Sequence, residues 1–243
     1  MQPGAPKKQT SPWVYIGCGC AALVVLAMVV MAVLTYITYR QGKELAEGWT
    51  DPVKREARTK EVLPYEKLPE GYYPMGTFSI PFIMDMAMFT DDPPPAGTTP
   101  ERGKESGGFK ERGFIYVKAR RVGRQGKELE DYVSGKGPAP DWLDVKTRAT
   151  GIDILRRGEV EVNGHKIAFT ASRGEVNHDG KTTNGITTTM LFGCPNQSSR
   201  VRVGIWFGPD PDPGKPAKEL DLAGTNADPE EIRKFAEHFR FCG

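Results

Sequence analysis

The sequence predicts an α+β fold, with one N-terminal transmembrane helix followed by one domain that has a mainly antiparallel sheet and a closing C-terminal helix. Three observations support this prediction. Residues 14–39 carry no charged side chain, strand-like runs separated by turn residues fill much of 113–207, and an amphipathic helical pattern follows Asp228. Strands and helices that are segregated in this way are typical of α+β domains.

The uncharged segment, residues 14–39, has the length of a membrane span. Its 26 residues form a helix of about 39 Å, which is enough to cross a hydrocarbon core of about 30 Å. Lys7 and Lys8 precede it as they would in a signal peptide, but the apolar part of a signal peptide has only about 7 to 15 residues. A retained anchor is therefore favoured, with the lipid bilayer as its partner. Aromatic residues lie where both membrane interfaces would fall: Trp13, Tyr15, Tyr36 and Tyr39.

Small residues gather near the start of this span. Gly17 and Ala21 have the small-xxx-small spacing that lets two membrane helices approach closely. A helix-helix dimer is one interpretation. The other is that these residues have no partner, since small residues are common in membrane spans.

The side of the membrane that the domain faces is predicted from two opposing signals. The Lys and Arg residues after the span outnumber those before it, which favours a cytoplasmic domain. Cys194 and Cys242 are the only two cysteines after the span, and an isolated pair of this kind favours a disulfide in an oxidising compartment. Such a bond contributes about 4 kcal/mol in the chain-entropy model. Two free buried thiols are the alternative, and we favour a periplasmic or extracellular domain.

Composition and the positions of Pro and Gly divide the chain into four parts: a tail at 1–13, the span at 14–39, a juxtamembrane stalk at 40–70 and a soluble domain at 71–243. Pro and Gly interrupt any long helix in the stalk. Within the domain, residues 91–112 are rich in Pro, Gly, Lys and Glu, and this composition predicts a flexible loop.

The predicted elements of the domain follow from local patterns. Strands are expected at 113–121, 185–192 and 200–207, and a short helix at 127–134. Asn163-Gly164 predicts a hairpin between 159–162 and 165–172, because both residues tolerate the positive φ of a type I′ turn. The closing helix starts at an Asp228 N-cap with Pro229 at its first position.

The sharpest candidate site is Met84-Asp85-Met86-Ala87-Met88. On a strand, alternate residues face the same way, so Met84, Met86 and Met88 share one face. Soft thioethers select Cu(I) or Ag(I), with Met75 or Met190 as a further ligand. The pattern therefore suggests a metal site.

The alternative, which we favour, is that these methionines fill an irregular part of the core. Ile80 and Phe82 continue the same alternation, and an apolar face of that kind is typically buried.

Other signals point away from common activities. The net charge is +2, so no strong field attracts nucleic acid. The basic residues around Lys118 and Arg120 lack interleaved aromatic residues, so they are interpreted as a solvated edge strand. Asp210 and Asp212 are interpreted as a solvated turn. No zinc, phosphate-loop or hydrolase signature is present, so no cofactor and no catalytic residue is assigned.

Two resemblances accompany these patterns. The Gly17-Cys18-Gly19-Cys20 span behind a short Pro-rich tail resembles uncharacterised, single-pass membrane-anchored proteins of bacteria, in the style of myxobacteria. This resemblance extends to the segment 220–242 and implies no activity. The order of strands, short helix, strands and closing helix resembles that of PsbP-like α/β folds, without a shared motif.

The function expected from the sequence is a membrane-tethered, non-enzymatic binding or structural module that faces the periplasm or exterior. Its partner is expected to be another envelope protein or a small ligand. Two alternatives remain open: a Cu(I)- or Ag(I)-handling protein that uses Met84, Met86 and Met88, and an enzyme whose site is assembled from dispersed residues.

Overall fold

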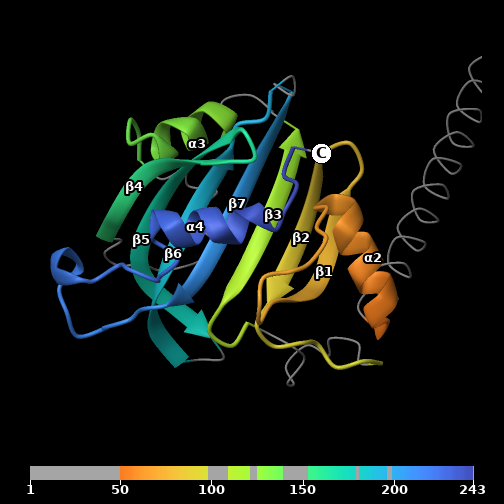
Figure 1. Cartoon of the computed structure of the whole chain (residues 1–243), viewed down its shortest axis with the longest axis horizontal. Helices are drawn as coiled ribbons and strands as arrows, with labels where there is room; N and C mark the ends of the chain where they lie inside the picture. Colours follow the sequence, from red (N-terminus) through yellow and green to blue (C-terminus); the bar gives the residue numbers. More distant parts are fainter. Residues whose placement is uncertain are drawn as a thin grey trace, which may run out of the picture. The chain divides into compact units, whose positions relative to one another are not determined.

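The computed structural model of the protein describes residues 50–97, 109–120, 125–138, 153–178, 181–195 and 199–242. These residues form a seven-stranded sheet in which all neighbouring strands are antiparallel, in the order β1-β2-β3-β7-β6-β5-β4 (Figure 1). The mainly antiparallel sheet and the closing C-terminal helix of the prediction are confirmed. The strands are β1 (Tyr73–Ile80), β2 (Met84–Thr90), β3 (Gly113–Arg120), β4 (Asp153–Val162), β5 (His165–His178), β6 (Lys181–Phe192) and β7 (Arg200–Pro209), and the helices are α2 (Pro52–Val62), α3 (Gln125–Val133), α4 (Pro229–Glu237) and the short 3-10 helix η1 (Ala217–Glu219).

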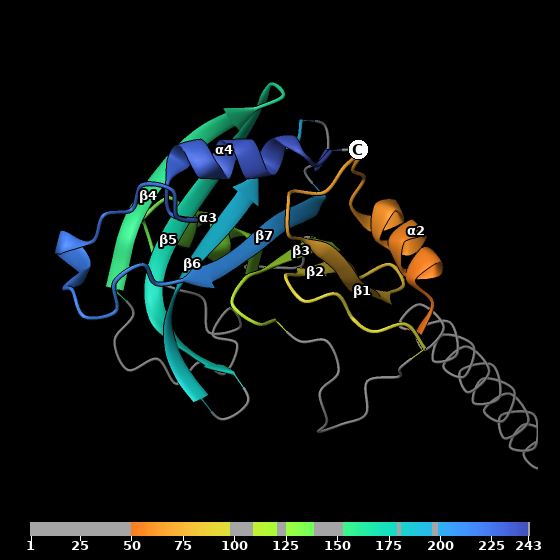
Figure 2. The ribbon, with the colours of Figure 1, turned by 60° about the horizontal axis from the view of Figure 1, so that its bottom comes forward.

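The main core lies on the face of the sheet that α4 crosses (Figure 2). The helix begins as predicted, because the Asp228 side chain accepts a hydrogen bond from the backbone N–H of Glu230. Its apolar stripe buries Ile232, Phe235 and Ala236. Phe235 stacks on Trp206 of β7, with ring centroids 4.2 Å apart, so the helix is held on the centre of the sheet.

Helix α3 packs on the opposite face. Leu129, Tyr132 and Val133 are buried against apolar side chains of β5, β6 and β7. The Thr170 hydroxyl of β5 donates to the Val133 carbonyl oxygen at 3.1 Å and anchors the end of the helix. Of the helices within the described residues, α3 alone contributes buried apolar side chains to this cluster, whose other members lie on β5, β6 and β7.

The segment predicted as a juxtamembrane stalk, residues 40–70, contains α2, which packs against β1 and β2. The residues that follow the helix enter the main core. Leu63 is fully buried, and Tyr65 forms an isolated antiparallel β-bridge with Phe239. The described part of this segment therefore belongs to the domain and is no separate stalk. No sequence pattern indicated this, because the segment Val62-Leu63-Pro64-Tyr65 is short, contains a proline and is flanked by charged residues.

The predicted tail, the span at 14–39 and the Gly17 and Ala21 pair lie outside the described residues. No helix within the described ranges has the length and apolar character needed to cross a membrane.

The ends of the predicted loop at 91–112 are held together. The Asp91 carboxylate accepts hydrogen bonds from the backbone N–H groups of Lys110, Glu111 and Arg112 at 2.9 to 3.0 Å. Residues 98–108 of this loop lie outside the described residues.

Candidate functional site

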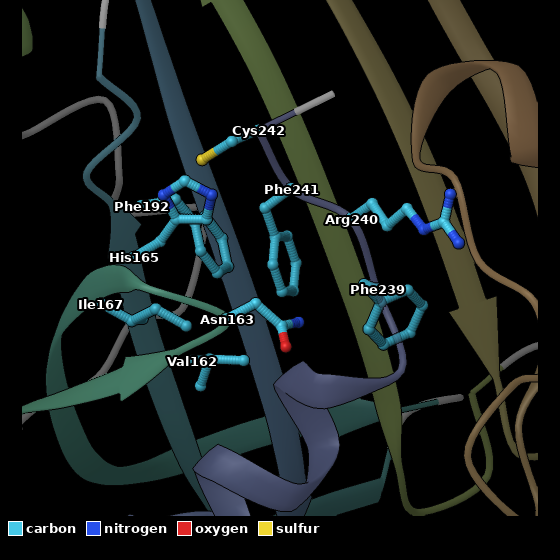
Figure 3. A pocket seen from close by; sticks show the side chains of 9 residues that line it. All are labelled: Val162, Asn163, His165, Ile167, Phe192, Phe239, Arg240, Phe241 and Cys242. Atoms are coloured by element: carbon cyan, nitrogen blue, oxygen red, sulfur yellow. The ribbon is translucent and has the colours of Figure 1, made fainter.

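A pocket of about 440 Å³ opens between the β4–β5 hairpin and the chain that follows α4 (Figure 3). Hairpin and strand side chains form one wall, and the C-terminal segment forms the other. Most of the lining is aliphatic or aromatic. The lining residues are Val162, Asn163, His165, Ile167, Phe192, Phe239, Arg240, Phe241 and Cys242.

The hairpin wall follows from the predicted turn. Asn163 and Gly164 have φ angles of 52° and 74°, as a type I′ turn requires, so the predicted hairpin is confirmed. Val162 pairs with His165 across the turn. Because side chains alternate along each strand, Ile167 lies on the same face as His165 and reaches the pocket.

The opposite wall is the segment after α4, which leaves the helix and crosses the end of the sheet. The Arg240 N–H donates to the Pro64 carbonyl oxygen at 2.8 Å. Phe241 stacks on Phe192 with ring centroids 3.8 Å apart, and its carbonyl oxygen accepts a hydrogen bond from the Tyr116 hydroxyl at 3.1 Å. Burial raises the pKa of Tyr116 to about 12, so this phenol stays a donor at neutral pH.

A disulfide between Cys194 and Cys242 lies at the C-terminal end of this wall. It confirms the pairing predicted from the isolated cysteines. The bond ties the end of the chain to the segment after β6, because Cys194 lies two residues beyond Phe192. The wall formed by the C-terminal segment is therefore held by a covalent link as well as by packing.

The polar groups of the pocket are few. Asn163 and His165 lie on the hairpin side, whereas the Arg240 side chain extends away from the pocket in Figure 3 and pairs with Glu66. The lining residues described here include no carboxylate, and their one imidazole belongs to His165. This arrangement suits the binding of an apolar molecule better than acid-base catalysis, which requires converging titratable groups.

The three predicted metal ligands lie elsewhere, on the face of the sheet that α3 partly covers. Met84, Met86 and Met88 are half-buried and share one face of β2, as the alternation predicts. The expectation that Phe82 continues this face is wrong, because a turn at 81–83 separates β1 from β2 and Phe82 is exposed within it. Ile80 does share the face, since it pairs with Met84 across the hairpin.

The basic residues lie on an interior strand, so their interpretation as a solvated edge strand is wrong. β3 lies between β2 and β7, and Lys118 and Arg120 pair with Arg202 and Arg200 of β7. Arg202 is only 2% exposed, and its Nε atom has no hydrogen-bond partner in the described part of the chain.

Asp210 is likewise buried and lies in no solvated turn. Its carboxylate accepts a hydrogen bond from Arg173 Nε at 2.5 Å. Arg173 also donates to the carbonyl oxygens of Asp212 and Lys215, so one guanidinium organises the turn. Asp210 therefore has a structural partner, which the sequence could not reveal because Arg173 lies on another strand.

The pocket itself was not predicted from the sequence. Its one early signal was the Asn163-Gly164 turn, which places His165 at the start of a strand. The apolar wall after α4 could be recognised only once the closing helix was placed on the sheet.

Comparisons with known proteins assign no family. No protein-family model matches the chain, and no curated protein matches it. One similar solved structure is that of PA94, a protein of unknown function from Pseudomonas aeruginosa. The two chains are 10% identical, and the match covers 55% of this chain and 81% of that one with a TM-score of 0.26. A likeness at this level supports no conclusion about function.

Proposed function

We propose that the protein is a membrane-tethered, non-enzymatic binding module whose domain faces the periplasm or exterior and whose pocket receives a small apolar ligand. The observation that carries the proposal is the pocket between the β4–β5 hairpin and the C-terminal segment. Its apolar lining and few polar groups are typical of ligand sites. The disulfide beside it supports an oxidising compartment.

Dye binding tests the pocket. We expect 1-anilinonaphthalene-8-sulfonate to bind at one saturable site, with increased fluorescence. Because the dye also enters bilayers, the titration uses residues 46–243, which form a compact unit. His165→Trp fills the pocket and should abolish binding, whereas His165→Gln should retain it.

The control for this titration is Lys218→Trp, which adds the same ring at an exposed position on η1. It should leave dye binding unchanged. Equal binding by the wild-type domain and the His165→Trp variant would exclude the pocket as the ligand site.

Thiol labelling of intact cells tests the tether and its direction. In a Cys18→Ser, Cys20→Ser background, a membrane-impermeant maleimide should label the chain from outside only after reduction of the Cys194–Cys242 bond. Labelling without reductant, and only in permeabilised cells, would place the domain in the cytoplasm with free thiols.

A Cu(I)- or Ag(I)-handling function is a second candidate. The observation that favours it is that Met84, Met86 and Met88 are half-buried on one face of β2 rather than enclosed in the core. Thioethers that solvent can reach are able to bind a soft metal ion.

Silver titration of the wild-type domain and of a Met84→Leu, Met86→Leu, Met88→Leu variant separates the two functions. Loss of binding in the variant would support metal handling. The matched control is Met190→Leu, because Met190 is fully buried in the main core, away from the methionine face of β2. Unchanged binding by the triple variant would exclude this function.

A further inference from the structure

The β1–β2 hairpin exposes an unusual amount of apolar surface. Within the described residues, seven large hydrophobic side chains are exposed, and five of them lie between residues 73 and 83. Exposed apolar side chains are unremarkable singly, but a contiguous group of them marks an interaction site. Four of the five lie at the turn or in the strand residues next to it, namely Phe78, Ile80, Phe82 and Ile83, whereas Tyr73 lies at the other end of the hairpin.

The tip of this hairpin carries the most exposed member. Phe82 is 92% exposed and Ile83 56%. Phe82 also has a φ of 65°, a left-handed conformation that turns normally assign to Gly or Asn. A bulky residue is disfavoured in this conformation because its Cβ approaches the following carbonyl oxygen, and burial against the described residues does not offset this cost.

The tip has a defined place beside β3. The Ile83 N–H donates to the Ile80 carbonyl oxygen at 3.0 Å, and the Ile83 carbonyl oxygen accepts a hydrogen bond from the Arg120 N–H at 2.8 Å. The apolar tip therefore lies next to the end of β3, which pairs with the start of β7.

That edge is basic. Register places Lys118 opposite Arg202 and Arg120 opposite Arg200, and like charges that face each other across strands are destabilising. Burial, Arg200 and Arg202 together lower the pKa of Lys118, against an opposing effect of Asp85. Asp85 of β2 lies opposite Lys118 in register and offsets part of this charge. The four cations outnumber this one carboxylate, so the group keeps a net positive charge among the described residues.

An apolar tip flanked by cations is the chemistry that an anionic bilayer surface binds. Apolar side chains enter the boundary between headgroups and acyl chains, and basic side chains contact the lipid phosphates. We propose that the β1–β2 tip and the basic edge dock the domain on an anionic phospholipid bilayer, with Phe82 and Ile83 inserted and Lys118, Arg120 and Arg200 on the headgroups. This proposal rests on the membrane tether of the proposed function.

The experiment measures the depth of a nitroxide at position 82. The full chain in the Cys18→Ser, Cys20→Ser background retains the Cys194–Cys242 bond, so a Phe82→Cys substitution adds the one thiol available for labelling. The labelled chain is reconstituted in nanodiscs of phosphatidylglycerol and phosphatidylcholine, or of phosphatidylcholine alone. The matched control is Ile154→Cys, at the exposed start of β4.

We expect the label at position 82 to be accessible to oxygen and shielded from a water-soluble nickel chelate in the anionic nanodiscs. The label at position 154 should remain accessible to nickel. Each of Lys118→Gln, Arg120→Gln and Arg200→Gln should lower the inserted population about fivefold, since a basic residue at an anionic surface contributes about 1 kcal/mol.

Two outcomes would overturn the proposal. Equal nickel access at positions 82 and 154 in anionic nanodiscs would show that the tip stays in water. Equal shielding of position 82 in nanodiscs of phosphatidylcholine alone would show that anionic headgroups do not direct the contact.

Failure of the tether gives a different result, because the chain would then not integrate into nanodiscs. The same depth measurement on the full chain mixed with preformed anionic vesicles would still decide whether the tip inserts. The contact and the tether can therefore fail independently.

Discussion

The ion pair between Arg173 and Asp210 shows how one buried charge organises a surface turn. Asp210 is buried, and Arg173 is tied to the carbonyl oxygens of Asp212 and Lys215. Removing one partner of a buried pair leaves the other charge without compensation.

We expect Asp210→Ala to lower the free energy of unfolding by about 3 to 5 kcal/mol, because it leaves the Arg173 guanidinium unpaired. Urea denaturation of the variant measures the change. Asp212→Ala, which removes a half-exposed surface partner of Lys215, should change stability by about 1 kcal/mol or less. A similar effect of both substitutions would contradict the role assigned to Asp210.

Tyr116 gives the domain a predictable response to alkaline pH. Its pKa is raised by burial to about 12, against about 10 in an unfolded chain. The unfolded state therefore loses the phenolic proton first as the pH rises. The contribution of Tyr116 to the free energy of unfolding is fully present below pH 10. It decreases by about 2 to 3 kcal/mol as the pH rises towards 12.

We expect the free energy of unfolding to fall between pH 10 and 12, and Tyr116→Phe to make this fall shallower. Guanidinium denaturation at a series of pH values measures the slope. The control is Tyr73→Phe, which changes an exposed phenol. An unchanged slope for Tyr116→Phe would show that Tyr116 ionises equally in both states.

At the scale of single elements, α4 depends on its N-cap. The Asp228 side chain accepts hydrogen bonds from the N–H groups of Gly224 and Glu230, and these bonds lower the pKa of Asp228.

We expect Asp228→Ala to lower the free energy of unfolding by about 1 kcal/mol. Asp228→Asn should retain most of the contribution of the cap, because Asn is also a favoured N-cap residue. Thermal denaturation followed by circular dichroism compares the two variants. Equal stability of the Ala variant and the wild type would show that Pro229 alone starts the helix.

The Cys194–Cys242 disulfide, which holds the C-terminal segment, is expected to stabilise the domain. With a sequence separation of 48, loss of the bond is expected to lower the free energy of unfolding by about 4 kcal/mol in the chain-entropy model. A Cys194→Ala, Cys242→Ala variant should show this loss in urea. It should also bind the dye more weakly, because Cys242 lines the pocket. Cys18→Ser with Cys20→Ser should leave stability unchanged.

At the scale of the whole molecule, one sheet carries two different surfaces. α4 and the end of α2 close the main core on one face, whereas α3 covers only part of the other. Beyond α3, the described part of this face includes the half-buried methionines of β2 and the exposed hairpin tip. The proposed ligand pocket and the proposed bilayer contact therefore use separate features of the same sheet.

Residues 46–243 form a compact unit that contains the whole described sheet. We expect this fragment to unfold in one cooperative transition at the same temperature as the domain in the full chain. Differential scanning calorimetry of both proteins makes the comparison. A fragment that unfolds at a markedly lower temperature would show that residues 1–45 stabilise the domain.

The local elements were predictable from the sequence because their signals lie within a few residues. Asn163-Gly164 marked the hairpin, Asp228-Pro229 marked the start of α4, and the isolated pair Cys194 and Cys242 indicated a disulfide. Each of these signals acts through backbone conformation, capping or covalent chemistry, which depend little on distant parts of the chain.

Burial and exposure were decided by the tertiary structure. The sequence placed Phe82 in a buried strand and Asp210 in solvent, and the fold reverses both assignments. Strand order placed Arg202 opposite Lys118, docked α2 into the core and formed the pocket beside Cys242. These outcomes depend on contacts between residues far apart in the chain, and no local pattern specifies which distant side chains meet. By itself, the sequence determined which elements form, whereas the packing of the sheet decided which side chains are available for function.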